Sequence, residues 1–160
     1  MYHLKAMKRV RLVVVIFAFF AFAQARALCV KVQMATLRAG PSFRDAITWR
    51  AGLYTPLVEL ASQGGWFKVK DMDGDIQWIP MGDVSQNMEC LSVRVQSAIL
   101  RMGPSRKAKL ANIVEVDRYT PFKQIDENGD WYKVEASWGS TYWINDNAVW
   151  LPLRIMRVSF

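Results

Sequence analysis

The sequence predicts an all-β fold made of two small β-barrels in tandem, and three observations lead to this prediction. The motif LRAGPS at residues 37–42 returns with one change as LRMGPS at residues 100–105, so the chain is a repeat. In both copies, short runs of alternating apolar and polar residues are separated by Gly, Pro and Asp, which is typical of strands and turns. No stretch has a helical period of useful length. Each copy has only about 60 residues, and closing its short strands into a barrel hides their edges.

The first copy contains six predicted strands. They lie at residues 28–33, 36–38, 47–49, 54–60, 66–70 and 76–79. Gly40 and Pro41 end the second of these strands, because Pro has no N–H to donate to a sheet. Pro56 interrupts the fourth, and we therefore expect that strand to lie at the edge of the sheet.

The second copy repeats this series, with two extra residues between its matching blocks, which is typical of a lengthened surface loop. Its predicted strands lie at residues 91–96, 119–126, 131–135 and 141–144, and residues 108–116 are expected to form a loop followed by a strand. Four tryptophans occur in register in the two copies. We expect them to fill the cores, and they are Trp66, Trp78, Trp131 and Trp143.

Residues 1–25 have the pattern of a secretory signal peptide. A basic start precedes a twelve-residue apolar run at 12–23, and residues 23–25 supply a small-x-small cleavage pattern. A membrane span needs roughly 20 apolar residues. We therefore expect an exported protein, periplasmic or associated with the cell envelope, that has no membrane span after cleavage; an uncleaved anchor is the alternative.

The charge of the chain is partly that of its leader. Without residues 1–25, 17 basic and 14 acidic residues leave a formal charge of +3 instead of +7. No run of basic residues suited to nucleic acid remains, and no nucleic-acid partner is expected. The densest basic cluster is Arg106, Lys107 and Lys109, which is either a solvated loop or an aid in holding an anionic polymer.

The only two cysteines, Cys29 and Cys90, stand at the entrances of the two repeats. An even pair in an exported protein favours a disulfide. Such a bridge would join the two repeats and stabilise the fold by roughly 4 kcal/mol in the chain-entropy model. The alternative is two separate thiols, each packed in its own first strand.

Each copy has an alternating strand, then Leu-Arg-x-Gly-Pro-Ser, then Gly-x-Trp-Phe/Tyr-Lys-Val, a polar hairpin and Trp-Ile. This order resembles the bacterial SH3-like domain, present twice, and we place the domains at residues 28–86 and 90–152, before a tail at 153–160. Gln77 and Tyr142 stand where the family usually has Gly. The resemblance implies a small exported β-barrel that binds peptidoglycan or a wall-associated peptide and has no catalytic activity or cofactor.

Catalysis has little support in the residues themselves. The sole histidine, His3, lies in the predicted leader, so no imidazole is left for general base work. A carboxylate-based cell-wall hydrolase is a remote alternative. The acidic hairpin at residues 71–75 is similar to a calcium loop but lacks the Gly and Glu positions of an EF-hand. We therefore expect a solvated hairpin and no metal site.

Candidate binding residues come from two sources. Three tryptophans have no counterpart in the other copy, and tryptophans exposed on loops are typical of binding surfaces: Trp49, Trp138 and Trp150. Packing between the repeats is the alternative for Trp150. The second source is the pairs of recurring residues Arg38 and Arg101, and Tyr54 and Tyr119. A guanidinium beside an aromatic ring suits a carboxylate or a sugar face, or else each Arg ties its turn to the barrel. A periplasmic adaptor that engages another protein is the alternative function.

Overall fold

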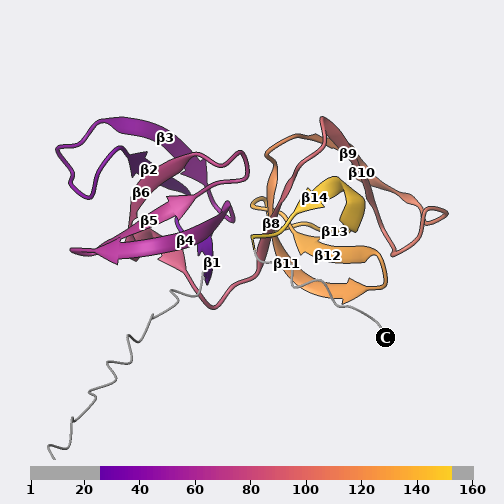
Figure 1. Ribbon diagram of the computed structural model, residues 1–160. Helices are drawn as coiled ribbons and strands as arrows, with labels where there is room; N and C mark the ends of the chain where they lie inside the picture. Colours follow the sequence, from indigo (N-terminus) through magenta and orange to yellow (C-terminus); the bar gives the residue numbers. More distant parts are fainter. Residues whose placement is uncertain (1–25, 153–160) are drawn as a thin grey trace, which may run out of the picture.

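Two antiparallel seven-stranded sheets make up the computed structural model, which describes residues 26–152 (Figure 1). The predicted signal peptide at residues 1–25 and the tail at residues 153–160 lie outside the described residues. No helix within the described range is long and apolar enough to cross a membrane.

The first sheet has the strand order β3-β2-β6-β5-β4-β1-β7, and we call it the first barrel. A 3-10 turn, η1 (Met81–Asp83), precedes its last strand. Its strands are β1 (Arg26–Val30), β2 (Met34–Arg38), β3 (Ile47–Gly52), β4 (Pro56–Gln63), β5 (Trp66–Lys70), β6 (Ile76–Pro80) and β7 (Val84–Ser85).

The second sheet, here the second barrel, has the order β10-β9-β13-β12-β11-β8-β14. This is the first order with seven added to every strand number, so the sequence repeat is also a repeat of topology. The predicted fold of two SH3-like barrels in tandem is therefore confirmed. The elements are β8 (Cys90–Val93), β9 (Ser97–Arg101), β10 (Leu110–Asp117), β11 (Pro121–Asn128), β12 (Trp131–Glu135), β13 (Thr141–Asn145), η2 (Asp146–Ala148) and β14 (Val149–Trp150).

The strand that carries Pro56 is not an edge strand, and that prediction was wrong. Strand β4 lies between β5 and β1, and the edges of the sheet are β3 and β7. Pro56 is the first residue of β4 and pairs with Cys29 of β1. At that end position the missing N–H does not interrupt the hydrogen bonds of the strand interior.

The two cores are built mainly from aliphatic side chains. Leu37 and Leu100, the first residues of the repeated motif, are fully buried in their respective cores. Of the four tryptophans predicted to fill the cores, only Trp66 is buried. The other three are half-buried because each precedes a residue that faces the core, and neighbouring side chains on a strand point to opposite faces. These pairs are Trp78 and Ile79, Trp131 and Tyr132, and Trp143 and Ile144.

A disulfide joins the two barrels, as one of the two sequence alternatives predicted. It links Cys29 of β1 to Cys90 of β8 across a Cα–Cα distance of 5.8 Å. In β8, Leu91 and Val93 belong to the core of the second barrel, so Cys90 and Ser92 point outward by alternation. Both are nevertheless buried, because the first barrel covers this face of β8.

Candidate functional site

A cleft of about 530 Å³ lies between the two barrels. The first barrel supplies most of its lining, from β3, the start of β4, and the hairpin between β5 and β6. The second barrel supplies Ser92 of β8 and Tyr119 from the loop before β11. Both barrels therefore contribute to the cleft, the first more than the second.

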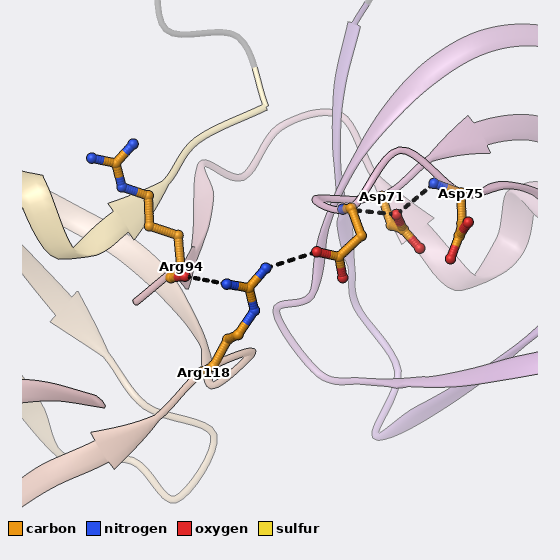
Figure 2. Close-up of polar contacts among 5 residues, drawn as sticks. Asp71, Asp75, Arg94 and Arg118 are labelled. Carbon is orange, nitrogen blue, oxygen red and sulfur yellow. Dashed lines mark hydrogen bonds and ion pairs between the residues drawn. The ribbon is translucent and has the colours of Figure 1, made fainter. Parts of the chain in front are cut away.

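The acidic hairpin between β5 and β6 forms one wall of the cleft, and Asp71 organises it. Oδ1 of Asp71 accepts hydrogen bonds from the backbone N–H groups of Asp73 at 3.0 Å and Asp75 at 2.9 Å (Figure 2). Oδ2 of Asp71 accepts a hydrogen bond from Nε2 of Gln77 at 3.2 Å. Gly74 completes the turn with a φ of 94°, which a residue with a side chain adopts only under strain.

Gln77 is part of the same network. Its side chain is buried, and its Oε1 accepts a hydrogen bond from the Thr48 hydroxyl at 2.6 Å. The Asp71–Gln77–Thr48 chain therefore connects the hairpin to β3. The Gln77 side chain thus fixes the acidic wall of the cleft in place.

One ion pair crosses from the acidic hairpin to the second barrel. Nη2 of Arg118 lies 2.8 Å from Oδ1 of Asp73, and Nη1 of Arg118 donates to the Arg94 carbonyl at 2.7 Å (Figure 2). The guanidinium also lies 5.0 Å from the ring centroid of Tyr119. Arg118 therefore connects the acidic wall to the aromatic side chain that the second barrel contributes to the cleft.

Tyr54 and Tyr119 share an uncommon backbone conformation. Their φ values are 69° and 72°, and they are the described residues other than Gly with positive φ. In each case the backbone N–H donates to a core strand, to the Val30 carbonyl at 2.8 Å and to the Val93 carbonyl at 2.9 Å. This strained turn is therefore a shared feature of both barrels, and it lies beside the cleft.

The two tyrosine side chains have different partners. Tyr119 lines the cleft and is 51% exposed. The Tyr54 hydroxyl donates to Oε1 of Glu135 in the second barrel at 2.8 Å. This hydrogen bond, burial and the negative charge of Glu135 all raise the pKa of Tyr54. Tyr54 therefore helps to join the barrels.

Polar and aromatic side chains of both barrels line the cleft. Ser92 of the second barrel is one of them and is only 4% exposed. Trp49 of β3 lines the same cleft and is 36% exposed. An aromatic face and a hydroxyl from different barrels are the kind of groups that orient a ligand.

The cleft brings together two of the residues singled out in the sequence, Trp49 and Tyr119. The recurring arginines lie elsewhere. Nη1 of Arg38 donates to the Asp45 carbonyl at 2.7 Å, and Nη1 of Arg101 donates to the Ala108 carbonyl at 2.8 Å. Each guanidinium thus binds the backbone of the loop that follows its own strand.

The remaining candidates do not line the cleft. Trp138 is exposed in the hairpin between β12 and β13, packs edge-on against Phe122, and donates from Nε1 to the Tyr142 hydroxyl at 3.2 Å. Trp150 is half-buried in β14, where it pairs with Ser92. The basic residues are exposed on the loop between β9 and β10, and they are Arg106, Lys107 and Lys109.

The sequence did not predict that Ser92 and the acidic hairpin line one cleft. The hairpin's sequence is similar only to a calcium loop. Within the described residues, no three His, Cys, Asp or Glu side chains converge as a metal site requires. The one available signal for Ser92 was alternation with the apolar residues of its strand, which predicts an outward side chain but not a partner barrel that covers it.

Comparison with known proteins identifies part of the chain. Residues 94–150 match the family described as the bacterial SH3 domain. Among solved structures, an NlpC/P60 family protein from Bacillus cereus ATCC 10987 is similar at 18% identity and a TM-score of 0.37, over 78% of this chain and 56% of that chain.

Two proteins from Trichomonas vaginalis are also similar. NlpC1 matches at 13% identity and a TM-score of 0.37, over 81% of this chain and 46% of its own. NlpC2 matches at 14% identity and a TM-score of 0.36, over 81% of this chain and 49% of its own. This chain thus spans about half the length of the solved structures that it matches. No curated protein matches it. The match to the bacterial SH3 domain thus covers most of the second barrel, and the first barrel has the same strand order as the second, as a tandem of SH3-like units would have.

Proposed function

We propose that the protein is an exported, non-catalytic binding module that recognises peptidoglycan or a cell-wall peptide in the cleft between its barrels. The cleft carries this proposal. Its volume of about 530 Å³ lies within the range of ligand sites in proteins. Its lining combines an aromatic face, Trp49, with polar groups from both barrels, which is the composition that such sites use.

Two further observations support the proposed location and the absence of catalysis. The disulfide between Cys29 and Cys90 is typical of an oxidising compartment outside the cytoplasm. The only histidine of the sequence, His3, belongs to the predicted leader, so the mature protein would have no imidazole for acid–base work.

Sedimentation with purified peptidoglycan tests the proposal. The protein without residues 1–25 is expected to pellet with the polymer at low salt and to release no soluble fragments into the supernatant. The Trp49→Ala variant is expected to lose binding. Trp138→Ala is the matched control, because this tryptophan is also exposed but lies outside the cleft. A wild-type protein that stays in the supernatant contradicts wall binding, and released fragments contradict the non-catalytic role.

A protein partner is the second candidate, and one surface favours it. Strands β9 and β10 and the loop between them expose Ile99, Met102 and Leu110. Apolar side chains on an open sheet edge are typical of surfaces that bind other proteins. A Leu110→Glu variant distinguishes the two functions. If the adaptor function is right, this variant is expected to lose binding to a periplasmic partner protein. If the cleft is the binding site, the variant is expected to sediment with peptidoglycan like the wild type.

A further inference from the structure

We infer that the cleft holds its ligand by a primary ammonium group, with the Asp75 carboxylate as the counter-ion. The inference rests on the proposed function, because it names the ligand chemistry of the same cleft. The charged side chains that line the cleft are all acidic: Asp71, Asp73 and Asp75. The cleft therefore attracts a cation and repels a carboxylate, although the chain as a whole has a formal charge of +7.

Of the three carboxylates, only that of Asp75 is available to a ligand. Asp71 accepts three hydrogen bonds within its own hairpin. Asp73 is neutralised by Arg118 at 2.8 Å. Asp75 is exposed, and its carboxylate makes no hydrogen bond or ion pair with another described residue. Its hydrogen bonds come from its backbone, whose N–H donates to Oδ1 of Asp71 (Figure 2) and whose carbonyl accepts from the Asp71 N–H.

The second barrel supplies an independent polar group for the same ligand. Ser92 lines the cleft, and the residue as a whole is only 4% exposed. Its hydroxyl oxygen can accept a hydrogen bond from a ligand N–H. The exposed face of Trp49 adds a surface on which a cation is attracted to the ring.

Recognition through an amine also agrees with the positions of the recurring arginines. A guanidinium free to bind a ligand would favour a carboxylate in the cleft. Arg38 and Arg101 bind backbone carbonyls of their own loops, and neither lines the cleft. Arg118, next to the cleft, is already paired with Asp73 and the Arg94 carbonyl.

A wall peptide can present a primary ammonium group at its N-terminus or on the side chain of a diamino acid. The probe is a synthetic alanyl-γ-glutamyl-lysine peptide, prepared unmodified, acetylated at the N-terminus, or acetylated on the lysine side chain. Titration calorimetry measures its Kd for the wild type and for Asp75→Asn, which keeps the side-chain shape and removes the charge. Asp130→Asn is the control, because Asp130 is exposed on the second barrel and does not line the cleft.

Acetylation of the ammonium group that the cleft binds and the Asp75→Asn substitution are each expected to weaken binding by about tenfold or more. When the acetylated peptide is titrated into Asp75→Asn, its Kd is expected to be close to the Kd measured with either change alone. The Asp130→Asn control is expected to bind the unmodified peptide like the wild type. Unchanged Kd values for both acetylated peptides and for Asp75→Asn, with wild-type binding intact, would overturn the ammonium inference alone. If the wild type binds none of the peptides and no peptidoglycan, the proposed function is overturned together with it.

Discussion

Removing the disulfide between Cys29 and Cys90 is expected to destabilise the first barrel selectively. The bridge closes a loop with a sequence separation of 61, and that loop contains β2 to β7. In the chain-entropy model, a loop of this length stabilises the fold by about 4 kcal/mol, because it restricts the unfolded chain. The restricted segment is the first barrel, so the second barrel gains little from the same bond.

The perturbation is the double variant Cys29→Ala and Cys90→Ala, compared with the wild type before and after reduction. Both cysteines are buried, so alanine avoids burying a new polar group. Hydrogen exchange followed by mass spectrometry in rising urea reports each barrel separately, through amides of β5 and of β12. We expect the free energy of opening to fall by about 4 kcal/mol in β5 and to change little in β12. An equal fall in both strands, or no fall in β5, would refute the reasoning.

Three smaller perturbations test other parts of the structure. Leu100→Ala empties a fully buried position in the second core and is expected to cost about 2–5 kcal/mol in unfolding experiments, with the loss confined to amides of that barrel. Gly65→Ala places a side chain at a φ of 84° and is expected to lower stability by roughly 1–2 kcal/mol in urea titration, a loss that would be absent if the turn can relax. Tyr54→Phe removes the hydrogen bond to Glu135, with an expected cost of about 1 kcal/mol in thermal melts. Because the pKa of Tyr54 is raised above 10.0 in the folded protein, this contribution is complete below pH 10.0 and is lost as the pH rises through the raised pKa. The cost of the substitution should therefore vanish at high pH, and a cost that persists there would contradict this origin.

The fold could be predicted from the sequence because its signals are local and occur twice. The repeated LRxGPS motif fixed the correspondence of the two barrels, and alternation identified most strands. The position of Pro56 in the sheet could not be predicted in this way. It depends on the pairing of β4 with both β5 and β1, and residues distant in the sequence determine that pairing.

The cleft was only partly predictable for a related reason. Trp49 and Tyr119 were identified one by one, but their proximity depends on how the two barrels dock. Four tryptophans occur in register in the two copies, and this recurrence favoured them as core residues. Neighbouring side chains on a strand point to opposite faces, however, and it is Ile79 and Ile144 that lie in the cores, with their tryptophan neighbours only half-buried. For Ser92 and Asp75, the sequence indicates an outward side chain and an acidic hairpin, but their place in the cleft depends on residues that are distant in the sequence.

The proposed function places a cell-wall peptide in the cleft between the barrels. Its most direct test is a titration of the ¹⁵N-labelled protein with soluble peptide fragments of peptidoglycan, observed through the indole N–H signals in NMR spectra. Trp49→Phe and Trp138→Phe variants assign the two informative signals. The account predicts that the Trp49 signal shifts with saturating dependence on peptide concentration, while the Trp138 signal stays in place. Shifts confined to Trp138, or no shift of the Trp49 signal at saturating peptide, would contradict it.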